Sequence, residues 1–125
     1  MGLGGALGAL CRYGVEQAFT ALAHGSPGFP WGTFGVNISG AFFLGWIFAR
    51  AETGADGGDW LRCFAGIGFC GAFTTFSSVN LEMLEMIRSQ AALLAGVYFM
   101  SSFACGIAAA SLGTMLGMKK REDLK

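Results

Sequence analysis

Charged residues are scarce in this 125-residue chain, at 13% of the sequence, and only two prolines and one histidine occur. A soluble domain usually carries about 25% charged residues, so the composition excludes an ordinary soluble domain. Eight basic residues balance eight acidic ones, and without an excess of positive charge we expect no nucleic-acid partner. The scarcity of proline and the lack of a three-residue glycine period exclude a collagen-like chain.

A metal site built from side chains is also disfavoured. The chain has a single histidine and no CxxC pair, so the usual ligand patterns are missing. Four cysteines lie within apolar runs, where packing is the default role: Cys11, Cys63, Cys70 and Cys105. No basic segment precedes the first apolar run, so we expect no cleavable signal peptide and a retained first segment.

Apolar residues and glycine are abundant where charged residues are scarce. Hydrophobic residues make up 54% of the chain, and 21 of 125 residues, about 17%, are glycine, against a usual figure near 7%. Twelve phenylalanines make the chain too apolar for disorder. Loops rich in glycine, proline and polar residues divide the sequence into four apolar segments, each long enough for the roughly 20 residues of a membrane span.

We therefore expect an all-α membrane protein, a single domain of residues 1–125 with four transmembrane helices. The spans are expected at about residues 3–23, 31–49, 60–87 and 91–118, with both termini on one side. That side would hold most of the basic residues outside the spans: Arg50, Arg62, Lys119, Lys120, Arg121 and Lys125. The opposite side would hold only Arg88. This asymmetry favours both termini in the cytoplasm.

Polar residues within the first two spans are candidates for function, because a polar group is costly in lipid. Arg12 and Glu16 are four residues apart, which predicts a structural ion pair on one helix face. The alternative is a proton or substrate site at Glu16, as in small drug exporters. Thr33 and Asn37 also share a face, and Asn37 is interpreted either as an interhelical hydrogen-bonding residue or as the lining of a polar pathway. Three glycines of this span offer small surfaces for close helix packing: Gly35, Gly40 and Gly45.

The third span contains a segment that disfavours helix. Gly71 is followed closely by Thr74, Thr75, Ser77 and Ser78, and such residues compete with helical hydrogen bonds. At about 28 residues the span is long enough for two half-helices. We expect a break at Gly71, Thr74 and Thr75, with a continuous helix as the alternative. Broken helices at membrane depth line cavities or are buried, and their freed carbonyls commonly hold a cation.

The fourth span carries a hydroxyl-bearing stripe. Tyr98 and Ser102 are four residues apart, and Gly106 and Ala110 continue the same face. The stripe either lines a polar pathway or contains serine that bonds back to its own helix backbone.

Three segments resemble the Fluc (CrcB) family of fluoride channels: residues 5–13 (GALGALCRY), 32–40 (GTFGVNISG) and 68–77 (GFCGAFTTFS). The TTFS segment after GFCG is the specific part, and the likeness covers nearly the whole chain. The resemblance implies a fluoride-selective channel of the bacterial cytoplasmic membrane that exports F− passively, and no enzyme activity. It also implies an antiparallel dimer with two pores along the subunit interface and a structural Na+ at the dimer centre.

The resemblance also implies roles for single residues. The carbonyls of Gly71 and Thr74 from each subunit would hold the Na+. Asn37 would be the pore amide and Phe76 the pore phenylalanine, since amide and hydroxyl donors and the positive edge of a phenyl ring replace the water around an anion. The polar track and the pore mouth would be completed by Thr33, Ser78, Tyr98, Ser102 and Glu82.

The chain departs from the family pattern at two positions. Val79 stands where the family usually has a second pore phenylalanine, and Gly106 stands at the later hydroxyl position of the fourth helix. The uneven distribution of basic residues also differs from the weak orientation bias that an antiparallel homodimer needs. Two alternatives therefore accompany the homodimeric channel. They are one subunit of a heterodimeric fluoride channel and a small proton-coupled multidrug exporter using Glu16.

Overall fold

The computed structural model describes residues 1–22, 28–52 and 58–122, and the regular elements in these ranges are all helices. Three are long and continuous: α1 (Gly2–Leu22), α2 (Trp31–Ala51) and α6 (Ala92–Glu122). Between α2 and α6 the chain forms a segmented rod of α3 (Gly58–Leu61), η1 (Arg62–Cys70), α4 (Gly71–Phe73) and α5 (Phe76–Arg88). Residue 23 at the expected end of the first span, the expected loop residues 24–27 and 53–57, and the last three residues of the chain lie outside the described residues.

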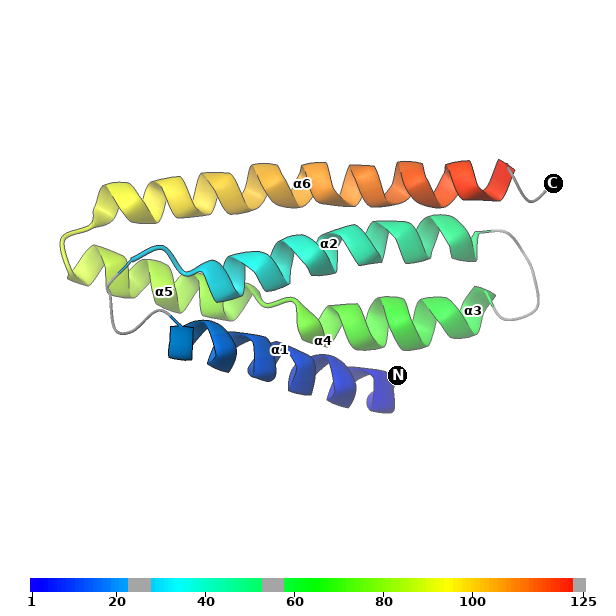
Figure 1. The fold of residues 1–125 in the computed structure, drawn as a ribbon, viewed down its shortest axis with the longest axis horizontal. Coiled ribbons are helices and arrows are strands. Elements are labelled where there is room, and N and C mark those ends of the chain that lie inside the picture. Colours follow the sequence, from blue (N-terminus) through cyan, green and yellow to red (C-terminus); the bar gives the residue numbers. More distant parts are fainter. Residues whose placement is uncertain (23–27, 53–57, 123–125) are drawn as a thin grey trace.

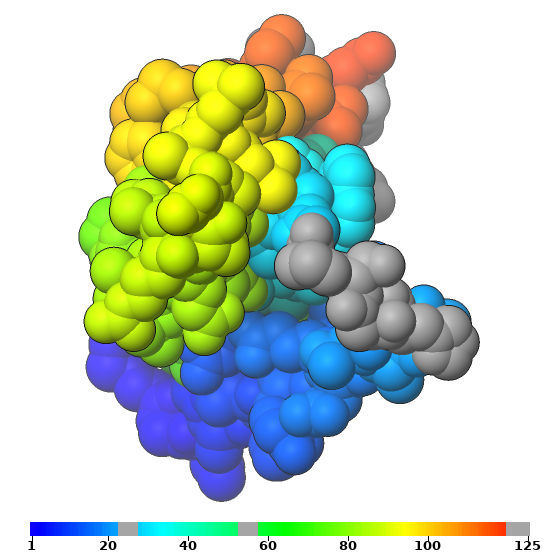
Figure 2. Space-filling model, turned by 90° about the vertical axis from the view of Figure 1, so that its left-hand side faces the viewer, coloured from blue at the N-terminus to red at the C-terminus, as the bar shows by residue number. Residues whose placement is uncertain are grey.

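The rods lie side by side in an elongated bundle (Figure 1). The end of α6 lies at one end of the bundle and the turn between α5 and α6 at the other, and α1 starts beside η1, nearer to the end of α6 than to that turn. Seen from the end opposite the termini, α5 and the start of α2 lie between α6 and α1 (Figure 2). Both ends of the described chain thus lie in the half of the bundle opposite that turn, and their placement on one side of the membrane stays a prediction.

Three segments are long and apolar enough to cross a membrane: Trp31–Ala51, Gly58–Arg88 and Ala92–Lys119. They match the second, third and fourth expected spans, and α6 continues to Glu122, beyond the expected end at residue 118. The first expected span forms α1, a helix of 21 residues. α1 is not among the three apolar segments, and its Arg12 and Glu16 make it more polar than a typical span.

The third rod is interrupted at two threonines. Thr74 (φ −75°, ψ 152°) and Thr75 (φ −145°, ψ 126°) have extended backbone between α4 and α5. Gly71 has helical backbone (φ −64°, ψ −32°) at the start of α4, so the hinge expected there lies instead at the threonines. The reason is that Thr75 serves as the N-cap of α5, a role that requires non-helical backbone. Before the break, Arg62–Cys70 forms a π-helical segment.

Glycine brings the helix backbones together. A Cβ atom built at Gly45 would lie 2.3 Å from the Ala110 carbonyl oxygen, and one at Gly113 would lie 2.1 Å from that of Phe42. These two residues let α2 and α6 touch backbone to backbone, in the most extensive helix contact of the bundle. Gly35, by contrast, has nothing within 4 Å of its Cβ position, so it brings no two helices of this chain together. The helix there simply faces open space.

The turn between α5 and α6 closes the bundle end opposite the termini. Gln90 adopts the left-handed conformation (φ 63°), and its N–H donates to the Ile87 carbonyl while the Ala91 N–H donates to the Met86 carbonyl. This is the Schellman pattern that ends a helix and reverses the chain. It brings α6 back against α5, where Val79, Met86, Ala95 and Tyr98 form a buried cluster.

Candidate functional site

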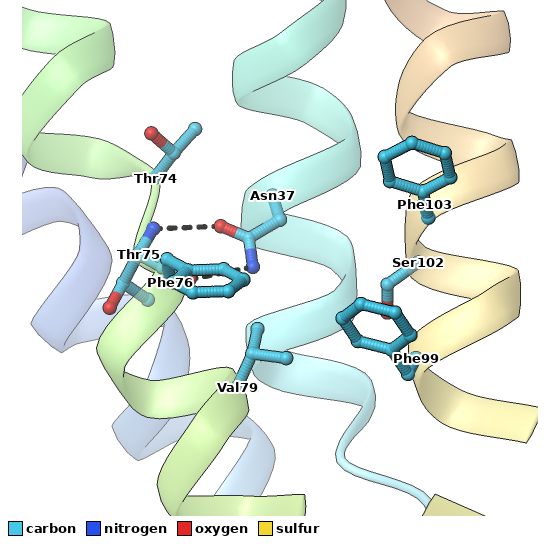
Figure 3. Close-up of a pocket in the computed structure, with 8 residues that line it drawn as sticks. All are labelled: Asn37, Thr74, Thr75, Phe76, Val79, Phe99, Ser102 and Phe103. Atoms are coloured by element: carbon cyan, nitrogen blue, oxygen red, sulfur yellow. Dashed lines mark hydrogen bonds between the residues drawn. The ribbon is translucent and has the colours of Figure 1, made fainter. Parts of the chain in front are cut away.

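The break in the third rod is held by Asn37 of α2. The Asn37 Oδ1 accepts a hydrogen bond from the Thr75 N–H at 2.8 Å, and the Asn37 Nδ2 donates to the Thr75 carbonyl at 3.0 Å (Figure 3). The side-chain amide thus pairs with both backbone groups of a residue 38 positions away. Thr75 is only 6% exposed, so without Asn37 two buried backbone groups would lose their partners.

This pairing has a consequence for the end of α4. In a continuous helix the Thr75 N–H would donate to the carbonyl four residues earlier, at Gly71. Here it donates to Asn37 instead, and the Gly71 carbonyl is released from the helical pattern. The Thr75 hydroxyl then caps α5 by accepting from the Ser78 N–H at 3.2 Å, and it also lies 3.1 Å from the Ser78 hydroxyl.

A cavity of about 260 Å³ lies beside this break, between the third rod and α6. It is lined by Asn37, Thr74, Thr75, Phe76, Val79, Phe99, Ser102 and Phe103. Figure 3 shows the side chains of Phe99, Ser102 and Phe103 directed from α6 toward Asn37 and Phe76. The Ser102 Oγ is buried and has no hydrogen-bond partner. The cavity therefore combines an amide and an unsatisfied hydroxyl with aromatic rings.

A second polar group surrounds Glu82 of α5. Thr33 of α2 donates to Glu82 Oε1 at 2.5 Å, and Tyr98 of α6 donates to Glu82 Oε2 at 2.7 Å. Tyr98 is fully buried and Thr33 is 3% exposed. One carboxylate thus ties α2, α5 and α6 together, with a hydroxyl on each oxygen.

A larger cavity of about 540 Å³ lies next to this group, between α1, α2 and α5. Thr33, Ser78 and Glu82 line it together with Glu16 of α1. Because the Ser78 hydroxyl also lies against the Thr75 hydroxyl, a hydroxyl pair connects the lining of the two cavities. Tyr98 lies behind the Glu82 carboxylate and lines neither cavity.

The expected ion pair between Arg12 and Glu16 is wrong. The Glu16 Oε1 is buried and accepts no hydrogen bond, and no ion pair joins these two residues of the described α1. The reason is tertiary packing. The α-carbon of Glu16 lies 3.6 Å from the Cβ position of Gly32, at the start of α2. Its carboxylate lines the second cavity.

The amino-acid sequence of the chain is similar to those of known proteins. Residues 1–114 match the family described as CrcB-like protein, Camphor Resistance (CrcB). The chain belongs to the CrcB family. A relative from Mycolicibacterium paratuberculosis, named Fluoride-specific ion channel FluC 1, is 41% identical over 119 residues, which cover 94% of this chain and 87% of the relative. A Thermus thermophilus protein named Fluoride-specific ion channel FluC is 41% identical over 117 residues, covering 92% and 90%.

Membership of the CrcB family and the three apolar helices make this chain a multi-pass membrane protein. Most polar residues expected in the site do lie around the two cavities. Phe99 and Phe103 were missed by the sequence analysis, which sought hydroxyls on the fourth span and not rings. Phe99 and Phe103 are four residues apart and share one face of α6 beside Ser102, so this spacing was the signal that could have found them.

Proposed function

We propose that this CrcB protein is a fluoride-selective channel through which F− leaves the cell passively. The observation that carries the proposal is the unpartnered Ser102 hydroxyl, which lines the cavity beside the Asn37 amide and Phe76. A buried hydroxyl without a partner costs about 1–3 kcal/mol, and an anion in the cavity would accept its hydrogen. The names of the relatives, fluoride-specific ion channels, support the same function.

The chemistry of the cavity suits a small anion that must pass and not stay. Its lining contains no Lys or Arg, so donors of modest strength replace the water around the ion. Asn37 has a second amide hydrogen that the Thr75 carbonyl does not use, and the edges of Phe76, Phe99 and Phe103 carry partial positive charge. A series of weak contacts allows an ion both to bind and to leave.

The cavity is incomplete within one chain, which supports a dimer. Phe76 is 69% exposed and Phe103 is 63% exposed, although both line the cavity. A second subunit packed over this face would close it. An antiparallel arrangement would produce two equivalent pores, one for each chain, with α1 as a fourth span. The partner is either a second copy or an oppositely oriented homologue that supplies the aromatic ring missing at Val79.

A structural Na+ fits the break. The Gly71 carbonyl is released from its helical hydrogen bond because the Thr75 N–H donates to Asn37, and Gly71 lies at the exposed surface. Neutral carbonyl oxygens are the ligands that broken membrane helices offer to Na+. The Gly71 and Thr74 carbonyls of two subunits would hold the ion. When bound, it would supply a positive charge that joins the two subunits at the breaks.

Fluoride efflux from liposomes tests the channel. Purified protein in vesicles loaded with KF and KCl should release F− and retain Cl− when a potassium ionophore sets the potential. Ser102→Ala should slow F− efflux about tenfold or more, since a hydrogen bond to an ion is worth about 1.5–3 kcal/mol. Ser111→Ala is the matched control, because the Ser111 hydroxyl is exposed and bonds only to the Ile107 carbonyl of its own helix.

Three results would contradict parts of this proposal. Equal effects of the two serine substitutions would remove Ser102 from the pathway. A protein that is silent alone but conducts after a homologue is added would exclude the homodimer and favour the heterodimer. Absence of F− efflux in every combination would exclude the channel itself.

A proton-coupled exporter is the second candidate, and the observation that favours it is the buried, unpartnered Glu16 Oε1 in the larger cavity. Efflux of a cationic dye, driven by a proton gradient and abolished by Glu16→Gln, would establish this function. Under the channel proposal, we expect no dye efflux and little effect of Glu16→Gln on F− release.

A further inference from the structure

Helix α2 contacts both extended residues of the break, Thr74 and Thr75. It uses two of its own residues for this, and both lie on the same face of the helix. Asn37 pairs with the backbone of Thr75. Gly40, three positions later and therefore on the same side of the helix, contacts Thr74. The Asn37 contact is made of hydrogen bonds, whereas the Gly40 contact depends on the absence of a side chain.

The methyl group of Thr74 occupies the space that a side chain at Gly40 would need. A Cβ atom built at Gly40 would lie 2.3 Å from Thr74 Cγ2 and 3.3 Å from Phe73 Cδ1. Gly40 is buried and Thr74 is partly buried. Real carbon atoms do not approach to 2.3 Å, so even alanine at position 40 must displace Thr74.

The opposite side of Thr74 is attached to its own helix. The Thr74 hydroxyl donates to the Cys70 carbonyl at 3.0 Å, and the Thr74 N–H donates to the same carbonyl at 3.0 Å. The side chain is thus held at its hydroxyl by the end of η1 and at its methyl by α2. With both branches of Cβ fixed, the rotamer and the adjoining backbone of Thr74 have a single orientation.

We infer that Gly40 is a positioning residue for the cation at the break: it seats the Thr74 methyl and so fixes the direction of the Thr74 carbonyl. The inference rests on the proposed Na+ at Gly71 and Thr74. It differs from ordinary helix packing, because the nearest neighbours of Gly45 and Gly113 are helix backbone atoms, whereas the nearest neighbour of Gly40 is a methyl group of a residue that would bind the ion. Removing that methyl should therefore restore what a side chain at position 40 disturbs.

Na+-dependent thermal stability of the purified protein tests this inference without relying on transport. Melting temperatures are measured over a series of Na+ concentrations, with N-methylglucamine replacing Na+. Wild type should be stabilised by Na+, because a ligand that binds the folded state raises its stability. Gly40→Ala should raise the Na+ concentration at half-effect by about ten- to a hundredfold, the range for residues that orient metal ligands.

The rescue variant is the double substitution Gly40→Ala with Thr74→Ser. Serine keeps the hydroxyl that bonds to Cys70 and removes the methyl that would meet the new Cβ, so the half-effect concentration should return to near the wild-type value. Thr74→Ser alone leaves the space beside Gly40 unfilled, so it should raise the half-effect concentration, but by less than Gly40→Ala does. Gly35→Ala is the matched control on the same helix, since nothing lies within 4 Å of its Cβ position.

A wild-type Na+ response in Gly40→Ala would overturn the inference, and so would failure of Thr74→Ser to restore that response. Absence of any Na+ effect in wild type would also overturn it. Failure of the channel proposal is separate, because it would appear as a lack of F− efflux while the Na+ responses of the five proteins still differed as expected.

Discussion

Asn37 shows how a polar residue at membrane depth uses its hydrogen-bonding capacity. One acceptor position and one donor hydrogen of its amide pair with the Thr75 backbone, and the remaining hydrogen is available to the cavity. The two interpretations that the sequence allowed, interhelical hydrogen bonding and pathway lining, are therefore compatible. A single amide can hold the break and still face the cavity that the break creates.

Tyr98 provides a prediction at the scale of one residue. Tyr98→Phe keeps the buried ring but removes the hydroxyl that donates to Glu82 Oε2 at 2.7 Å. We expect a loss of about 1–3 kcal/mol in the free energy of unfolding, because the buried carboxylate oxygen loses its donor. Denaturant titration in detergent measures the change. Tyr13→Phe is the control, since Tyr13 is 62% exposed; equal losses for the two variants would contradict the prediction.

The third rod shows how an element is divided by local chemistry. Two threonines in sequence leave the helical region, and the hydroxyl of the second starts a new helix by capping it. The break therefore interrupts the third rod and is also the N-terminus of α5. The α5 helix that starts there carries Glu82 toward Thr33 and Tyr98.

Substitution of the cap tests the division of the third rod. Thr75→Ala removes the acceptor of the Ser78 N–H and should destabilise the protein by about 1 kcal/mol, the usual value of an N-cap. Thr75→Ser keeps the hydroxyl and should be near wild type. Unfolding by denaturant in detergent compares the two. Equal destabilisation by alanine and serine would show that the methyl group matters and the cap does not.

Close contact between α2 and α6 provides a second prediction at the scale of elements. Gly113→Ala would place a Cβ 2.1 Å from the Phe42 carbonyl oxygen, so the helices must separate. We expect a loss of about 1–3 kcal/mol, as for overpacked interiors. Gly96→Ala, on the same helix with nothing within 4 Å, should be neutral or slightly stabilising because alanine favours helix. The ratio of folded to unfolded protein in SDS titrations measures both.

On the scale of the whole molecule, aromatic rings gather toward both ends of the bundle, but arginines stack on them at one. The end at which α6 terminates carries Arg50 over the Trp46 ring at 5.3 Å and Arg62 over the Phe48 ring at 5.1 Å. Trp60 stacks on Phe64 near the same end. Aromatic residues are enriched at both membrane interfaces and basic residues on the cytoplasmic side, so the arginines predict that this end faces the cytoplasm.

Reporter fusions test the topology of the whole chain. Reporters at the two termini should lie on the same side of the membrane, and one inserted after Ser89 should lie on the opposite side. This outcome requires α1 to cross the bilayer, although it is more polar than the other three spans. Termini on opposite sides would show that α1 lies at the surface, and the four-span proposal would be wrong.

Much of the fold follows from local sequence. The apolar segments, the helix-breaking threonines and the turn at residues 88–90 each depend on residues that are neighbours in the chain, so composition and propensity predict them. The prediction was wrong where local rules compete with packing. The i, i+4 spacing of Arg12 and Glu16 favours an ion pair, but in the assembled bundle Glu16 lines the cavity between α1, α2 and α5.

The sequence by itself determined a glycine-rich helical membrane protein of the CrcB family with an interrupted third helix, because these properties depend on composition, local propensity and motif order. Only the tertiary structure decided what the polar and small residues contact. Asn37 meets Thr75, Gly40 receives Thr74 and Ser102 lacks a partner because separate helices pack at particular rotations and heights. Spacing along one helix cannot specify its rotation against another, so these contacts arise only when the bundle is assembled.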